Sequence, residues 1–137
     1  RLEANDILVV EGHGNIKGIG RCAVWDGSIP NCVHQNHLIR VRPNYQKTNS
    51  IYLSRFLNSA GGRYYLEMIS NTTSGLNTIS TGKLKDCPIL LPPLSLQKEF
   101  TSIVLQQNKV EEQQQESARQ AEHLFQTLLH RAFRGEL

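Results

Sequence analysis

The feature that most constrains this fold is a long stretch without helix breakers. After Pro92-Pro93 no Gly or Pro occurs until Gly135, and Gln, Glu, Leu and Ala dominate. Such a stretch, stopped by Gly just beyond its last helical residue, predicts one continuous helix. At 1.5 Å per residue the helix would extend roughly 55–60 Å, more than the width of a small domain. We therefore expect a compact domain over residues 1–93 and a long helix over 94–137.

The long helix carries a seam with coiled-coil spacing, in alternating steps of three and four residues. Its members are Phe100, Ile103, Gln107, Val110, Gln114, Ser117, Ala121, Leu124 and Leu128. A single helix would leave the apolar members in water, so a partner helix is expected. The helix-pairing residues are then Phe100, Ile103, Val110, Leu124 and Leu128. The isolated chain is expected to form a homodimer through them; the alternative is a helix folded back on its own domain.

The part before the two prolines mixes Gly, Pro, Asn and β-branched residues, which is typical of an α+β domain. Strands are predicted over 6–10, 21–25 and 33–41, the second closed by an Asp26-Gly27 hairpin turn. A helix is predicted from a cap at Asn49 or Ser50 to a stop at Gly61-Gly62, followed by a turn or two up to Ile69. Residues 11–20, with four glycines, and the polar stretch 71–83 are predicted to be loops.

Composition excludes several classes of protein. No apolar run approaches the roughly 18–20 residues of a membrane helix. Three scattered cysteines indicate reduced thiols in a cytoplasmic protein rather than a disulfide framework. The chain begins without Met or an apolar signal segment, so we interpret it as a fragment or processed product.

The sequence offers no motif for catalysis or for a cofactor. The glycines at 12, 14, 18 and 20 lack the G-x-G-x-x-G spacing and precede a strand rather than a helix. Gly82-Lys83 fails as a Walker loop, and Leu91-Pro-Pro-Leu94 lacks the polar residue and aromatic of an adenine-methyltransferase loop. Cys32-x-His34-x-x-His37 invites a metal interpretation, but on a strand its two histidines would point to opposite faces. No catalytic residue, cofactor or metal is expected.

Nucleic-acid binding accounts for more of the pattern. The net charge of +3 is uneven: residues 1–94 carry a net +4 and residues 95–137 a net −1. Loops in the basic part present Asn, Gln, His and Ser, whose side chains can read base edges, beside cations that can contact phosphate. The candidates for base contact are His13, Asn15, His34, Gln35, Asn36, Ser74 and Asn77. The candidates for phosphate contact are Lys17, Arg21, Lys83 and Lys85.

Several segments resemble the specificity (S) subunits of type I restriction–modification systems. The run Asn5-Asp6-Ile-Leu-Val-Val resembles the family's "GDIL" strand, with Asn5 where the family usually has Gly. Tyr52-Leu53 to Phe56-Leu57, Thr78 to Lys85, Pro88 to Leu94 with Gln97 to Phe100, and the terminal His130 to Leu137 are also similar. The resemblance covers essentially the whole chain. It implies the C-terminal part of a second target recognition domain followed by the terminal conserved helix.

The resemblance implies that the chain reads double-stranded DNA and carries no chemistry of its own. Methyltransferase (M) subunits and a restriction and translocase (R) subunit would supply the reactions, in the cytoplasm of a bacterium or archaeon. Each recognition domain would read one half of a bipartite target, and an antiparallel pair of conserved helices would set the gap between the halves. The alternatives are a coiled-coil protein–protein scaffold without DNA readout and an enzyme with an unrecognised motif.

Overall fold

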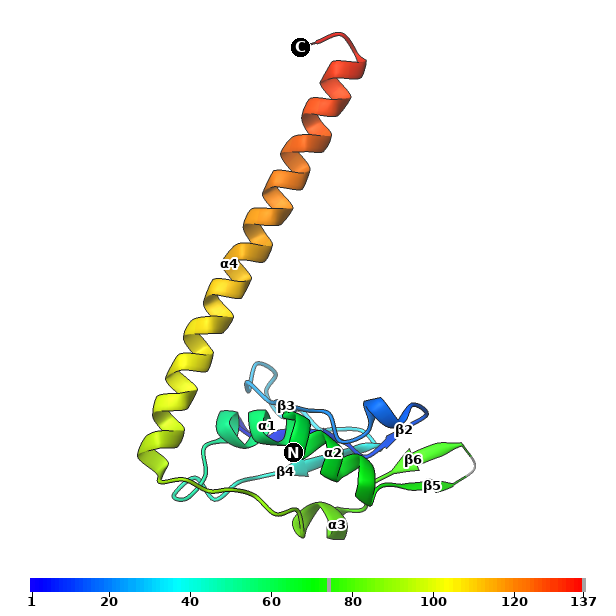
Figure 1. The fold of residues 1–137 in the computed structure, drawn as a ribbon, viewed down its shortest axis with the longest axis vertical. Helices are drawn as coiled ribbons and strands as arrows, with labels where there is room; N and C mark the ends of the chain where they lie inside the picture. Colours follow the sequence, from blue (N-terminus) through cyan, green and yellow to red (C-terminus); the bar gives the residue numbers. More distant parts are fainter. Residues whose placement is uncertain (74, 137) are drawn as a thin grey trace. The chain divides into compact units, whose positions relative to one another are not determined.

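The computed structural model describes residues 1–73 and 75–136 and contains two units, Arg1–Thr101 and Ser102–Leu137. Figure 1 shows the small strands and short helices of the first unit and the long helix α4, Leu94–Phe133, which starts in the first unit and continues through the second. Gly135 follows α4 with φ 71°, a left-handed conformation that suits Gly after a helix end. The α+β class and the uninterrupted C-terminal helix are thus as predicted.

Three antiparallel strands form the main sheet in the order β3-β1-β4, with β1 at Ile7–Val10, β3 at Cys22–Val24 and β4 at Leu38–Val41. Alternate side chains of β1 point to one face, and Ile7 and Val9 are fully buried there. They pack in one core with Leu53, Leu57 and Leu66 of the two helices that cover this face. The central strand of the sheet is therefore the segment that resembles the family's "GDIL" strand.

Two helices cover the core, α1 at Ser50–Asn58 and α2 at Ala60–Ile69. Asn49 caps α1, as expected, by accepting hydrogen bonds from the amides of Ile51 and Tyr52. The predicted stop at Gly61-Gly62 is wrong, because Ser59 caps a new helix and both glycines lie in its first turn. A Cβ at Gly62 would lie 2.3 Å from the Phe56 carbonyl oxygen, so this Gly allows α2 to start against the end of α1.

A second small sheet replaces the two predicted loops. It has the order β2-β6-β5, with β2 at Gly12–His13, β5 at Asn71–Thr73 and β6 at Leu76–Thr78. A 3-10 helix, η1 at Ile16–Gly18, follows β2, and a short helix, α3 at Thr81–Lys85, follows β6. The pairing of Gly12 with Thr78 joins segments far apart in the sequence. Both predicted loops are therefore partly ordered by a contact that no local pattern indicates.

The segment between β3 and β4 differs from the prediction. Gly27, with φ 80°, turns the chain and Asp26 accepts a hydrogen bond from the Ser28 amide, but β3 and β4 each pair with β1 and not with one another. The third strand begins only at Leu38, because His37 adopts φ 72°, which no strand tolerates. His34 and His37 therefore do not lie on a strand, contrary to the expectation from the sequence. Among residues 1–73 and 75–136, no three His, Cys, Asp or Glu are grouped as metal ligands would be.

The residues that begin β1 tie it to the rest of the core. Asn5 has φ 72°, so an Asn does adopt the left-handed conformation where the family usually has Gly. The Asp6 carboxylate is fully buried and receives two hydrogen bonds from Arg42, Nε to Oδ1 at 2.7 Å and Nη2 to Oδ2 at 2.8 Å. The Arg42 hydrogen bonds hold the pKa of Asp6 below its usual 3.8.

Replacing Asp6 with Asn is expected to lower the free energy of unfolding by about 2 kcal/mol, because one buried partner of a bidentate charged pair is lost. Since the folded pKa of Asp6 lies below the unfolded one, its contribution is present above about pH 4 and is lost as the pH falls through the folded pKa. Urea unfolding of both proteins between pH 7 and pH 2.5, followed by fluorescence of Trp25, the single tryptophan, measures both effects.

The control for this substitution is Asp26→Asn. Asp26 is exposed, and its carboxylate accepts hydrogen bonds from the amide and the hydroxyl of Ser28, which an Asn oxygen can also accept. We expect Asp26→Asn to leave stability nearly unchanged. A loss of stability in Asp6→Asn no greater than in this control would contradict the role given to the Asp6–Arg42 pair.

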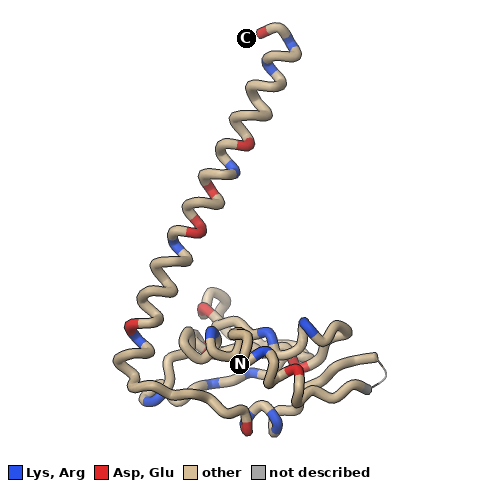
Figure 2. Tube along the Cα trace, in the orientation of Figure 1, with Lys and Arg blue, Asp and Glu red and all other residues tan. Residues whose placement is uncertain are grey.

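The long helix α4 is polar over most of its surface. Acidic and basic residues are interspersed along it (Figure 2), and Glu116 and Arg119 form an ion pair of 2.8 Å one turn apart. In the described part of the chain, no helix is both long enough and apolar enough to cross a membrane.

Candidate nucleic-acid interface

Three segments that carry candidate residues meet at the small sheet. Strand β2 pairs with β6, so His13 lies opposite Asn77. Glu11 lies just before β2. Its amide donates to the His37 carbonyl at 2.8 Å, and the Glu11 carbonyl accepts from the Ile79 amide at 2.9 Å. The β2–η1 loop, the β5–β6 hairpin and the end of the 26–37 loop therefore lie together on the first unit.

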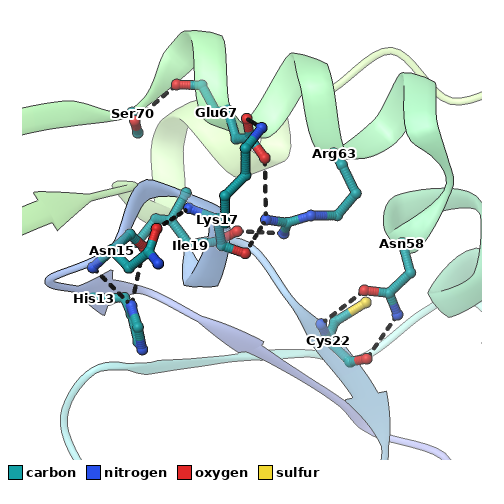
Figure 3. Close-up of polar contacts among 9 residues, drawn as sticks. All are labelled: His13, Asn15, Lys17, Ile19, Cys22, Asn58, Arg63, Glu67 and Ser70. Atoms are coloured by element: carbon teal, nitrogen blue, oxygen red, sulfur yellow. Dashed lines mark hydrogen bonds and ion pairs between the residues drawn. The ribbon is translucent and has the colours of Figure 1, made fainter.

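His13 and Asn15 form one arrangement at the start of the η1 loop (Figure 3). The Asn15 amide donates to His13 Nδ1 at 3.0 Å, and the Asn15 side-chain oxygen accepts from the Lys17 amide at 2.9 Å. The His13 ring lies over Gly18, where an added Cβ would be 2.3 Å from Nδ1. Both side chains are exposed at their outer ends, so this loop presents a His and an Asn in a defined geometry.

Helix α2 holds the same loop through Arg63 and Glu67 (Figure 3). Arg63 donates to the carbonyls of Lys17, at 2.9 Å, and Ile19. Glu67 accepts from Lys17 Nζ at 2.9 Å and from Arg63 at 3.4 Å. The hydrogen bond from Lys17 holds the pKa of Glu67 below its usual value. Sequence reasoning missed Arg63 and Glu67, because both look like ordinary charges on an amphipathic helix.

An open depression of about 490 Å³ lies beside this loop and is lined by Lys17, Arg21, Cys22, Asn58, Arg63 and Glu67. The Asn58 side chain accepts a hydrogen bond from the Cys22 amide at 3.2 Å and donates one to the Cys22 carbonyl at 2.8 Å, and so holds this part of β3 in place. Burial raises the pKa of the Cys22 thiol, so the thiol stays neutral. Arg21 is exposed, and its guanidinium has no hydrogen-bond or ion-pair partner among the described residues. The depression thus brings two phosphate candidates, Lys17 and Arg21, to one place.

Asn77 is placed differently from the exposed candidates. It is only 7% exposed, and its amide nitrogen donates to the carbonyls of His13 and Gly14, both at 3.2 Å. Its side-chain oxygen accepts from the Thr72 hydroxyl at 2.8 Å. In this structure Asn77 thus links β6 to the His13 loop. Ser74, the candidate at the tip of the same hairpin, lies outside the described residues.

His34, Gln35 and Asn36 are exposed in the 26–37 loop, where His34 Nδ1 makes a short-range contact with the Gln35 carbonyl at 3.2 Å. Their loop ends at His37 beside Gly12, so they belong to the same end of the first unit as His13. The two lysines of α3 differ from one another. Lys83 donates to the Ile69 carbonyl at 2.6 Å and to the Asn71 side chain at 2.9 Å, whereas Lys85 is exposed without a bonded partner in the described part of the chain.

Comparison with characterised proteins gives a consistent result. The chain is 34% identical to the type I restriction enzyme StySPI specificity subunit of Salmonella potsdam, over 99% of this chain and 30% of that protein. It is 30% identical to the EcoKI specificity subunit of Escherichia coli, over 100% of this chain and 30% of that protein. A putative MjaX specificity subunit of Methanocaldococcus jannaschii is 30% identical over 76% of this chain and 24% of that protein.

This chain belongs to the type I specificity-subunit family. The resemblance inferred from the sequence motifs is therefore confirmed. The chain spans about a third of the length of the relatives it matches, since it covers 30% of each of the first two. No protein-family model matches the chain.

The segment of this specificity-subunit chain from Pro92 to Thr101 has a clear structural role. Gln97 is fully buried on α4, where its side-chain oxygen accepts from the Asn49 amide at 2.9 Å. Its nitrogen donates to the carbonyls of Lys47, at 3.0 Å, and Pro92, at 2.8 Å. One side chain thus joins the prolines, the first turn of α4 and the start of α1. Sequence reasoning noted Gln97 only within the resemblance; an isolated polar residue on a helix gives no sign of burial.

The candidate helix-pairing residues are largely exposed. The exposed fractions of Ile103, Val110, Leu124 and Leu128 are 60%, 46%, 58% and 41%. Phe100 has a second role within the first unit, because its ring meets that of Tyr52 edge-on with centroids 5.8 Å apart. In this specificity-subunit chain Ile103, Val110, Leu124 and Leu128 are therefore exposed apolar side chains at the spacing of the seam.

Proposed function

We propose that this chain takes part in DNA sequence recognition within a type I restriction–modification complex, where it reads one half of a bipartite target. The observation that carries the proposal is similarity, over essentially the whole chain, to two specificity subunits at 34% and 30% identity. The exposed His, Asn and Gln side chains at one end of the first unit, with Lys17 and Arg21 on the depression beside the His13 loop, support it. The chain itself would carry no catalytic chemistry, which would reside in M and R subunits of the complex.

The proposal gives distinct tasks to the side chains. Base contacts are assigned to His13, Asn15, His34, Gln35, Asn36, Ser74 and Asn77. Phosphate contacts are assigned to Lys17, Arg21, Lys83 and Lys85. Lys17, Asn77 and Lys83 have protein partners, so they would have to exchange those hydrogen bonds for DNA. His13, Asn15, Arg21 and Lys85 would need no such exchange at their exposed ends, and we expect them to dominate binding.

Helix α4 would set the distance between the two halves of the target by pairing with a second helix. In a complete complex that helix would belong to the same specificity subunit. For the isolated chain we propose a second copy, in an antiparallel homodimer. The polar seam positions Gln107, Gln114 and Ser117 lower pairing strength but can fix register, which a spacer requires.

Replacing Lys85 with Ala is expected to weaken binding to all duplexes by a similar factor. Lys85 is free to meet a phosphate, and each such contact releases counterions on binding. The slope of log affinity against log salt concentration should therefore fall by about one, with no change in sequence preference. The measurement is a titration of random duplex DNA at several salt concentrations, with the chain alone and with its methyltransferase subunits.

Lys109→Ala is the matched control, since Lys109 is an exposed lysine of α4 outside the candidate interface. Its salt slope should equal that of the unchanged chain. A salt slope near zero for the unchanged chain in both forms would favour the rival function, a coiled-coil scaffold that does not bind DNA. An unchanged slope in Lys85→Ala alone would refute only the phosphate assignment.

A further inference from the structure

Helix α2 holds the loop that carries His13 and Asn15 by its backbone. The Arg63 guanidinium donates to the carbonyls of Lys17 and Ile19, which lie on either side of Gly18. The Arg63 side chain is only 16% exposed, and Glu67, one turn later on α2, accepts from it. Because its donors point to the loop carbonyls and Glu67, Arg63 is poorly placed to contact DNA.

The backbone from Lys17 to Ile19, which Arg63 binds, also lies beneath the His13 ring. The ring lies so close to Gly18 that a Cβ there would be 2.3 to 2.5 Å from three of its atoms. His13 Nδ1 in turn bonds the Asn15 amide at 3.0 Å, and the Asn15 side chain bonds the Lys17 amide at 2.9 Å. A shift of the Lys17–Ile19 backbone would therefore move both candidate base-reading side chains together (Figure 3).

We propose that Arg63, oriented by Glu67, is a positioning residue for sequence readout, which it controls without touching DNA. This inference rests on the proposed function, because it assumes that His13 and Asn15 meet base edges. A base-edge hydrogen bond depends on placement to within about 0.5 Å, whereas a phosphate contact tolerates more movement. Loosening the loop therefore costs discrimination between sequences much more than it costs overall affinity.

The test is selection of preferred duplexes from a randomised library by the chain assembled with its methyltransferase subunits, followed by titration at several salt concentrations. For Arg63→Gln we expect about a tenfold loss of preference at the base pairs read by this loop. Affinity for random duplex and the salt slope should stay at their original values. Gly18→Ala, which displaces the His13 ring and leaves Arg63 in place, should lose preference at the same base pairs.

Asn58→Ala is the matched control. Asn58 lines the same depression and makes two backbone hydrogen bonds, but it makes them to Cys22 of β3 and not to the loop. Its loss should lower the melting temperature and leave preference intact. If Arg63→Gln fails to fold, Arg63→Lys replaces it, because a lysine keeps the charge but cannot donate to both loop carbonyls as the planar guanidinium does. Glu67→Gln then tests whether Glu67 orients Arg63.

The outcomes separate the two proposals. Retention of the original preference by a folded Arg63→Gln would overturn the positioning role and leave DNA recognition standing. A drop of about one in the salt slope of Arg63→Gln would also overturn it, by making Arg63 a phosphate contact. A complete lack of preference in the unchanged complex would refute the proposed function, and the positioning role with it.

Discussion

Replacing Gln97 with Ala is expected to lower the free energy of unfolding of residues 1–101 by about 3 kcal/mol, a larger loss than that of Asp6→Asn. The fully buried side chain serves three backbone groups: the Asn49 amide and the carbonyls of Lys47 and Pro92. Alanine leaves all three groups without that partner, at a part-buried contact, and leaves a gap where the fully buried side chain was. The cost is therefore that of three hydrogen bonds and a buried side chain rather than of one ordinary hydrogen bond.

Urea unfolding followed by Trp25 fluorescence measures this loss, because Trp25 belongs to the first unit and follows β3 directly. The matched control is Gln106→Ala, which removes an exposed Gln from the same helix. It should change stability by less than about 0.5 kcal/mol. Equal stability of the two variants would show that the contacts of Gln97 do not hold the start of α4 to α1.

The local patterns of the sequence were sufficient for the parts of the fold that local physics determines. The absence of breakers between Pro93 and Gly135 predicted α4, and the Asn49 side chain predicted the start of α1. These features depend on residues within a few positions of one another, where propensity and capping act. The apolar run Ile7–Val10 is also local, and it predicted a strand there, although not its central place in the sheet.

The parts that the sequence did not reveal depend on distant partners. The small sheet forms because Gly12 pairs with Thr78, and neither strand is long or apolar enough to indicate itself. Gly61-Gly62 looked like a stop because two glycines disfavour a helix, but Ser59 caps α2 and the close approach to Phe56 requires a residue without Cβ. In each case tertiary packing outweighed local propensity.

The candidate site shows the same division. Exposed residues such as His13, Asn15 and Arg21 could be chosen from side-chain chemistry alone. What the sequence could not reveal is which polar groups have partners inside the protein. Asn77 and Lys83 have such partners, and the loop depends on Arg63 from a helix more than 40 residues away. Since hydrogen bonds across such separations leave no periodic trace, only the structure distinguishes the two groups.

Replacing both Leu124 and Leu128 with Glu is expected to abolish self-association of the chain. In the structure these side chains are 58% and 41% exposed, in a stripe that continues through Phe125 and Leu129. Burial of one Leu contributes about 1.5–3 kcal/mol, so a two-fold pair that covers both leucines from each chain could gain several kcal/mol before association costs. We therefore expect a dimer at micromolar concentration. Four buried carboxylates would oppose it by desolvation and mutual repulsion, raising the dissociation constant more than about 100-fold.

Sedimentation or light scattering of the isolated chain over a concentration series measures this association. The matched control is Gln115→Glu with Gln126→Glu, which adds the same charge to the exposed helix at positions outside the seam. This control should remain dimeric, and both variants should keep the Trp25 fluorescence of the folded first unit. A monomeric unchanged chain at high concentration would refute self-pairing. Both variants carry the same added charge and differ in which face of α4 bears the new carboxylates. If the control dissociated as fully as the leucine variant, association would therefore be governed by net charge and not by the seam.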